Sequence, residues 1–314
     1  MERVERTVTT PDGRILAVQE AGDPAGLPVV VHYGTPMNGH LYGPHAADAA
    51  SRGLRLISYD RPGYGGSTPQ PRRIVADCAA DVMAICESLG LSQIAVWGIS
   101  GGGPHALATA ALLPELVVAA ASLAGPAPYD ADGLDWFDGM GKDNADGFRL
   151  RLTDPAAARA EADAEREMVL TASPADLAAG LRSLFSPVDA EAFTGELADY
   201  VIRSFREALA RGTEGWWEDQ CAQTGAWGFD LASISVPVLV VQGRQDRFVP
   251  FGHGQWLAAH IPGAEAWLRE DDGHWTPYAY RVTEVHAWLS DRFAGPQTGE
   301  RRSLAPNLNL RQSG

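Results

Sequence analysis

The sequence predicts an α/β fold in which a mostly parallel central sheet carries helices on both faces and a helical cap is inserted into the chain. Short apolar runs rich in β-branched residues alternate with helical segments up to residue 126, as expected for parallel strands joined by helices. Helical segments rich in alanine and charge then dominate residues 127–232, and strand character returns at 236–242. We therefore expect a core domain of residues 1–126 and 233–294 and a cap of residues 127–232. The polar residues 295–314 are expected to be a disordered tail.

The expected strands are short and mostly apolar. Residues 28–33 (PVVVHY) have the composition of a strand buried on both faces, as in a parallel sheet. The other strand candidates, in chain order, are residues 14–20, 54–59, 93–97, 117–124, 236–242 and, more weakly, 264–268. Helices are expected at 45–52, 74–89, 104–113 and 278–293, and Gly53 and Gly90 mark the ends of the first two.

Composition narrows the class of partner. The formal net charge is −15, from 25 basic and 40 acidic residues. Because such a surface repels phosphate, we expect no nucleic acid or membrane partner. The net charge says little about the substrate, and the expectation of a small-molecule substrate comes from the motifs described below. The three cysteines (Cys78, Cys86 and Cys221) form neither a disulfide framework nor a metal-ligand pattern, so no metal or organic cofactor is expected. No apolar stretch approaches the ~20 residues of a membrane span, and the N-terminus lacks the apolar run of a secretory signal, which favours a cytoplasmic protein. Assembly into a homo-oligomer stays open.

The segment 98–102 carries the first candidate for chemistry. Gly98-Ile99-Ser100-Gly101-Gly102 matches the G-x-S-x-G pattern, with a strand candidate before it and a helix candidate after it. In that context the serine occupies a sharp strand-to-helix turn with its hydroxyl exposed at the sheet edge. The glycines allow the close approach of strand and helix that the turn demands. Ser100 is therefore the predicted nucleophile.

A serine nucleophile needs a base that is itself held by an acid. Asp246 follows the strand candidate 236–242, and His274 follows 264–268, so the order along the chain is serine, acid, histidine. We predict Asp246 as the orienting acid and His274 as the base. The rival acid is Asp130, which follows 117–124. Other histidines are less well placed: His253 and His260 are expected to be exposed, His286 lies in the last helix, and His40 and His45 fit a substrate contact or a capping role better.

The negative charge that develops on a substrate oxygen needs two backbone N–H donors. Gly101, the residue after the nucleophile, is one predicted donor. Thr35, in the turn Gly34-Thr35-Pro36 after the strand 28–33, is the other, although this segment is also consistent with a simple turn.

These motifs resemble those of the α/β-hydrolase superfamily over residues ~10–126 and ~233–293. Gly34-Thr35-Pro36 is similar to the family's H-G-x-P, with Tyr33 where the family usually has histidine. The segment 60–67 (DRPGYGGS) looks like its D-x-x-G-x-G-x-S loop. The resemblance implies an α/β-hydrolase fold with a helical cap. Serine at position 100 argues against the haloalkane dehalogenases and epoxide hydrolases of this superfamily, which use aspartate there.

The motifs and the resemblance together favour a carboxylic-ester hydrolase that acts on a small, rather apolar ester or lactone through an acyl-enzyme. Hydrolysis of a carbon–carbon bond in a β-diketone-like substrate on the same triad is an alternative, and so is a non-catalytic ligand-binding protein of this fold. Trp136 and Trp216, each in an aromatic pair of the cap, are predicted to bind substrate. They could equally form the core of the cap.

Overall fold

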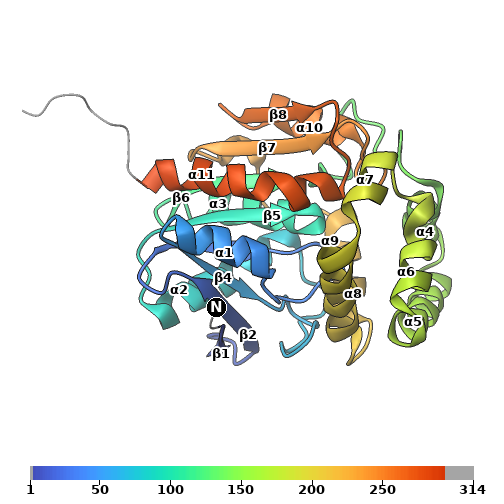
Figure 1. Ribbon diagram of the computed structural model, residues 1–314, viewed down its shortest axis with the longest axis horizontal. Helices are drawn as coiled ribbons and strands as arrows, with labels where there is room; N and C mark the ends of the chain where they lie inside the picture. The colour runs from blue at the N-terminus through green and yellow to red at the C-terminus, as the bar shows by residue number, and fades with distance from the viewer. Residues whose placement is uncertain (1–2, 294–314) are drawn as a thin grey trace, which may run out of the picture.

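Eight strands form one sheet in the order β1-β2-β4-β3-β5-β6-β7-β8 (Figure 1). The structure is a computed structural model, and it describes residues 3–293. The strands are β1 (Val4–Thr9), β2 (Ile15–Gly22), β3 (Leu27–His32), β4 (Leu54–Tyr59), β5 (Ile94–Ile99), β6 (Val117–Leu123), β7 (Val238–Gly243) and β8 (Glu265–Arg269). The pairs β1–β2 and β2–β4 are antiparallel, and every other pair is parallel. The predicted fold class is confirmed. The predicted tail, residues 295–314, lies outside the described residues.

Strand β1 was not among the predicted strands. It pairs with β2 from Val4 opposite Glu20 to Thr9 opposite Ile15. Only Val8 of its six residues is buried, so this edge strand has no apolar run that could mark it in the sequence. Its pairing partner, and not its own composition, defines it.

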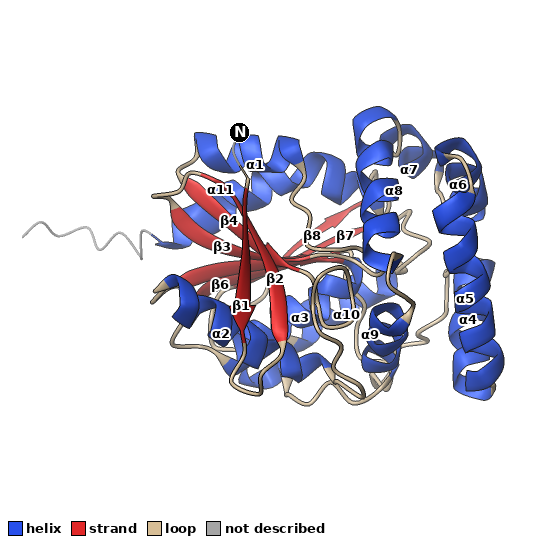
Figure 2. Cartoon of the chain, turned by 90° about the horizontal axis from the view of Figure 1, so that it is seen from below, coloured by secondary structure: helices blue, strands red, loops and turns tan. Residues whose placement is uncertain are grey.

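Helices cover both faces of the sheet (Figure 2). One face carries α1 (Gly43–Ser51) and α11 (Val282–Phe293), and the other carries α2 (Cys78–Leu89), α3 (Gly103–Leu112) and α10 (Phe251–His260). Side chains alternate between the two cores, since Val29 and Val31 of β3 lie in one cluster and Val30 lies in the other. All three valines are fully buried, which explains the continuous apolar run.

The chain between β6 and β7 is helical. It contains α4 (Lys142–Thr153), α5 (Pro155–Thr171), α6 (Pro174–Gly180), α7 (Pro187–Ala192), α8 (Gly195–Leu209) and α9 (Glu214–Thr224). Figures 1 and 2 both place these helices together on one side of the sheet. We call residues 127–232 the helical insertion. Its side chains contact loops that follow β3, β4 and β8, so it lies at the carboxyl edge of the parallel strands. Within residues 3–293, no helix combines the length and the apolar character needed to cross a membrane.

Candidate active site

Ser100 lies in a strained turn at the end of β5. Its φ angle is 54°, in the left-handed region that residues other than glycine rarely adopt. The turn brings strand and helix so close that a Cβ atom on Gly98 would lie 2.1 Å from the carbonyl oxygen of Gly102. A Cβ atom on Gly102 would lie 2.0 Å from the carbonyl oxygen of His32 on the neighbouring strand. Both glycines are therefore required by close approach, as the sequence pattern indicated.

The loops after β7 and β8 bring Asp246 and His274 together. Nδ1–H of His274 donates a hydrogen bond of 2.8 Å to Oδ2 of Asp246, and both side chains are buried. Oδ1 of Asp246 accepts two further bonds of 2.8 Å, from the backbone N–H groups of Phe248 and Val249. The amide of Gln242 donates to Oδ2 at 3.0 Å. The carboxylate of Asp246 thus accepts four hydrogen bonds, which fix its position. It orients the imidazole so that Nε2 stays available to accept a proton.

The surroundings of His274 stabilise the charged imidazolium form of its ring. Burial disfavours the charged imidazolium, but the carboxylate of Asp246 outweighs this, so the pKa of His274 lies above its usual range. The ring of Phe248 stacks on the imidazole with a centroid separation of 4.5 Å. His274 is therefore both electrostatically supported and held in place by packing.

Ser100, Asp246 and His274 lie at one edge of the sheet. Only β6 separates β5 from β7, so the ends of these two strands are about 10 Å apart. Transfer of the Ser100 proton to His274, with Asp246 supporting the imidazolium, stays a prediction.

The turn after β3 lies beside Ser100. A Cβ atom on Gly34 would be 3.3 Å from the Cβ atom of Ser100, and a Cβ atom on Gly101 would be 2.4 Å from Oγ1 of Thr35. Thr35 and Gly101 are therefore neighbours next to the serine, where the sequence predicted both to supply N–H donors. Their role in binding an oxyanion stays a prediction. Tyr33, the departure from the family pattern, is buried, and its hydroxyl accepts the N–H of Tyr42 at 3.3 Å.

A buried ion cluster holds this turn to the helical insertion. Asp219 of α9 is fully buried, and its carboxylate binds Arg61 at 2.5 Å and Arg73 at 2.6 Å. The hydroxyl groups of Thr35 and Tyr64 donate to the same carboxylate at 2.7 and 2.9 Å. Burial disfavours the charged carboxylate, but the two guanidinium groups outweigh it and hold the pKa of Asp219 below its usual range.

Arg61 and Gln223 complete the contacts of the turn. Arg61 donates to the backbone carbonyl oxygens of Tyr33 and Gly34, so a cation fixes the peptide groups just before Thr35. Gln223, also on α9, donates from Nε2 to Oγ1 of Thr35 at 3.2 Å. Asp219 and Gln223 were not predicted from the sequence, and Arg61 was noted only as part of the 60–67 motif, since the partners of these residues lie far away in the chain.

The rival residues have other partners. Asp130 is exposed in the loop after β6, and the carboxylate bonded to the His274 ring is that of Asp246.

The prediction that His253 is exposed was wrong: it is fully buried, accepts the N–H of Ala127 at 3.0 Å and donates to the carbonyl oxygen of Trp136 at 2.9 Å. His286 pairs with Asp48, His45 with the carbonyl oxygen of Tyr278, and His260 is exposed and stacks on Trp256. His40 lies 3.6 Å from Glu207.

The two predicted substrate-binding tryptophans differ in environment. Trp136 is buried, donates to the carbonyl oxygen of Ala127 at 2.9 Å and packs its ring against Tyr129, Phe137, Phe148 and His253. These contacts are typical of a small core. Trp216 lies on α9 and is half-buried. Neither ring belongs to the aromatic contacts around His274, so substrate binding by these two residues stays a prediction.

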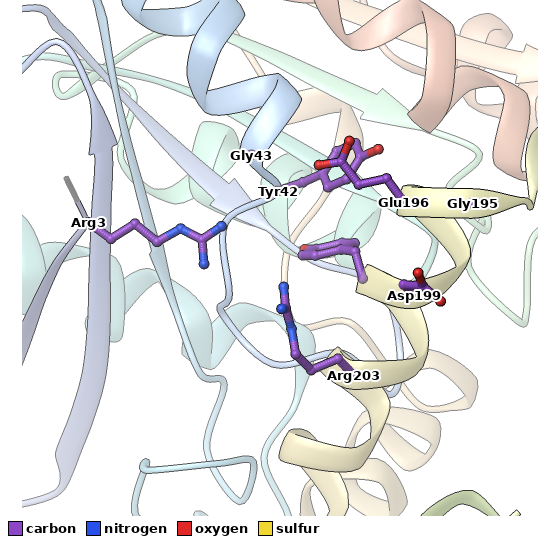
Figure 3. A pocket seen from close by; sticks show the side chains of 8 residues that line it. Arg3, Tyr42, Gly43, Gly195, Glu196, Asp199 and Arg203 are labelled. Carbon is purple, nitrogen blue, oxygen red and sulfur yellow. The ribbon is translucent and has the colours of Figure 1, made fainter. Parts of the chain in front are cut away.

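The described surface has a cavity away from these residues. Its volume is about 480 Å³, and it lies between α8 and the chain just before α1. Figure 3 shows Arg3 and Arg203 extending into it from opposite sides, with Tyr42 and Glu196 on its wall. None of Ser100, Asp246 and His274 lines it. Within residues 3–293, no group of three or more His, Cys, Asp or Glu side chains is placed to hold a metal ion.

Comparisons with known proteins agree with the fold. The family model described as alpha/beta hydrolase fold matches residues 28–278. The chain is 28% identical over 276 residues to a non-heme chloroperoxidase of Streptomyces lividans, covering 85% of this chain and 91% of that protein. It is 25% identical over 243 residues to a 2-hydroxy-6-oxononadienedioate/2-hydroxy-6-oxononatrienedioate hydrolase of Pseudomonas putida, covering 73% of each chain.

Comparison with solved structures supports the same fold. A thermophilic esterase from Thermogutta terrifontis superimposes with a TM-score of 0.66 at 22% identity, covering 93% of this chain and 99% of that one. A likeness at this identity concerns the fold alone. Since the family model spans most of the chain, this protein belongs to the α/β-hydrolase fold family.

Proposed function

We propose that the protein is a serine hydrolase that cleaves a small, rather apolar carboxylic ester or lactone. The observation that carries the proposal is the buried 2.8 Å hydrogen bond between His274 and Asp246 at the sheet edge where Ser100 occupies its strained turn. A hydrolytic serine needs this combination, because an unassisted hydroxyl is a poor nucleophile.

The proposed reaction has two halves. Oγ of Ser100 attacks the carbonyl carbon while Nε2 of His274 takes the serine proton. The oxyanion accepts hydrogen bonds from the N–H groups of Thr35 and Gly101. His274 returns the proton to the leaving alcohol, and an acyl group remains on Ser100. Water, deprotonated by His274, then attacks the acyl carbon, the bond to Oγ of Ser100 breaks, and His274 returns the proton to Oγ as the acid leaves. Asp246 stabilises the imidazolium in both halves.

Aromatic side chains around His274 support an apolar substrate. Phe248 stacks on the imidazole, and Trp275 meets it edge-on at 5.7 Å. Phe185 and Phe193 of the helical insertion pack against these two rings. Apolar side chains with a few polar groups are typical of small-molecule sites, so these rings beside the base favour a substrate with an apolar acyl or alcohol group.

A second candidate is hydrolysis of a carbon–carbon bond in a β-diketone-like substrate on the same three residues. The similarity to the Pseudomonas putida hydrolase of 2-hydroxy-6-oxononadienedioate supports it. The two candidates share the triad and differ in the shape of the substrate pocket that each would require.

Labelling with a fluorophosphonate tests the proposal, because only an activated serine reacts with this reagent. We expect labelling of the unaltered protein and none of the Ser100→Ala variant, with a loss in ester hydrolysis on the order of 10³-fold or more. Ser122→Ala is the matched control, since Ser122 is a buried serine on the neighbouring strand β6. It should label normally.

An unlabelled but folded protein would favour a ligand-binding role over catalysis. If labelling succeeds, a series of 4-nitrophenyl esters of increasing acyl length and a β-diketone, each assayed for products, separate the two reactions. A kcat/KM that is larger for the diketone would overturn the ester proposal and leave the triad in place.

A further inference from the structure

A carboxylate of the helical insertion binds the loop that carries His274. Oδ2 of Asp189, in α7, accepts the backbone N–H of His274 at 3.0 Å, and Oδ1 accepts the N–H of Trp275 at 2.7 Å. Oγ of Ser186 donates to Oδ2 at 2.9 Å. The Asp189 side chain is fully buried. One side chain therefore bridges two consecutive peptide groups of a loop that lies 85 residues away in the sequence.

The charge of Asp189 is satisfied by hydrogen bonds. Among the described residues, no arginine, lysine or histidine side chain lies within ion-pair distance of this carboxylate. A buried carboxylate without a cation costs free energy unless hydrogen bonds compensate it. Two backbone N–H groups and one hydroxyl do so here, and the negative charge remains next to the imidazole of His274.

Gly273 explains why the loop can approach so closely. A Cβ atom at this position would lie 2.3 Å from Oδ2 of Asp189, and any side chain would push the loop and the carboxylate apart. The contact between the loop and Asp189 therefore requires a glycine immediately before His274.

Two carboxylates act on His274. Asp246 holds the ring through Nδ1, and Asp189 holds the backbone of the same residue. The pKa of His274 is raised because these charges outweigh its burial, with Asp246 the larger cause and Asp189 the smaller. Of the other ionic groups of the loop, Asp272 pairs with Arg281 at 2.9 Å, Glu270 pairs with Arg244 at 2.5 Å, and Asp271 is exposed.

We propose that Asp189 is a positioning residue for the base: it fixes the His274 loop so that the ring keeps its bond to Asp246, and it makes the helical insertion part of the catalytic arrangement. The inference rests on the proposed serine-hydrolase function. Displacement of α7 removes both N–H acceptors at once, so the base is correctly placed only when the insertion is seated on the core.

Asp189→Asn tests this role. An amide keeps the size of the side chain, but it removes the charge and turns one acceptor into a donor that faces a backbone N–H. We expect kcat to fall about 10- to 100-fold with KM changed by less than about threefold, since misplacement affects the transition state more than binding. The acid limb of the pH profile of kcat should move to lower pH, because the pKa of His274 falls.

Two further variants separate position from charge. Asp189→Glu keeps the charge and lengthens the side chain, so kcat should fall while the acid limb stays near its original pH. Glu191→Gln is the matched control, because it removes one charge from an exposed position of the same helix α7, and it should leave kcat and the acid limb unchanged. If Asp189→Asn fails to fold, the comparison of Asp189→Glu with Glu191→Gln still tests positioning.

A readout that needs no activity completes the test. The ring signals of His274, assigned by their loss in His274→Gln, can be titrated by NMR in the unaltered protein and in Asp189→Asn. A lower midpoint in the variant supports the inference. Unchanged titration, together with an unchanged kcat for the folded fraction of both Asp189 variants, would overturn it and leave Asp189 a structural residue. Failure of fluorophosphonate labelling in the unaltered protein would instead count against the proposed function.

Discussion

The hydroxyl of Thr35 donates a 2.7 Å hydrogen bond to Oδ2 of Asp219, and this bond connects the turn beside Ser100 to helix α9 of the insertion. The same carboxylate is the anionic partner of both Arg61 and Arg73, which are themselves buried. One residue of the insertion therefore supports both the position of the turn and the burial of two cations.

Asp219→Asn is expected to lower the free energy of unfolding by about 3–5 kcal/mol, because two buried guanidinium groups lose their countercharge. Activity on an ester should fall in the folded protein as the turn loosens. Urea unfolding and kcat/KM measure the two effects. Thr35→Val is the control, as it removes one hydroxyl and keeps the ion cluster, so its cost should be about 1 kcal/mol. A loss below about 1 kcal/mol for Asp219→Asn would contradict the prediction.

Asp246→Asn should reduce kcat by several orders of magnitude, whereas Asp130→Asn should change it little. The reason is that Asp246 bonds to the His274 ring and Asp130 is exposed after β6. Since Asp246 raises the pKa of His274, the acid limb of any remaining activity should move to lower pH in Asp246→Asn. Reversed losses for the two variants would identify Asp130 as the orienting acid.

Gly102→Ala should prevent normal folding of the turn at Ser100 and cost about 3 kcal/mol or more, because the added Cβ atom would meet the carbonyl oxygen of His32 at 2.0 Å. Gly147→Ala in α4 is the matched control, since a Cβ atom there would meet nothing within 4 Å. It should stabilise the protein by about 0.5–1 kcal/mol. Thermal unfolding of both variants checks the contrast, and equal effects would count against it.

Buried neutral histidines predict a loss of stability in acid. Burial lowers the pKa of His45 to about 3, so the folded protein keeps this ring neutral, while the unfolded chain binds a proton below about pH 6.5. Its contribution is complete above that pH and is lost as the pH falls toward 3. In His45→Gln the difference in unfolding free energy from the unaltered protein should shrink by about 2 kcal/mol between pH 7 and about pH 4.5. Urea unfolding at both pH values measures this, and a constant difference would refute it.

Trp136→Ala and Trp216→Ala should have different effects. Trp136 is buried among aromatic rings, and its removal should cost about 3–5 kcal/mol of stability. Trp216 is half-buried, and if it lines the pocket its truncation should shift preference toward bulkier acyl groups with the smallest ester still hydrolysed. Melting temperatures and kcat/KM over an ester series distinguish the outcomes. Unchanged selectivity in both variants would mean that neither ring lines the site.

Local patterns in the sequence were sufficient to predict seven of the eight strands, most of the helices that cover the sheet and the strand-to-helix turn at Ser100. The run of valines in β3 reports burial on both faces, and the glycines around Ser100 report a close approach of backbones within five residues. Edge strand β1 escaped prediction because five of its six residues are exposed. It lacks the apolar pattern by which a strand is detected.

The contacts of the helical insertion could not be predicted in this way. Asp219 reaches Thr35 across 184 residues, and Asp189 reaches His274 across 85, so no spacing in the chain indicates either pair. Ser186 and Asp189 look like an ordinary start of a helix, and His253 looks like a polar residue on a surface helix. Whether such side chains are buried and paired depends on how the insertion packs against the carboxyl edge of the sheet, because only there do carboxylates, guanidinium groups and peptide N–H groups distant in sequence come within hydrogen-bond distance.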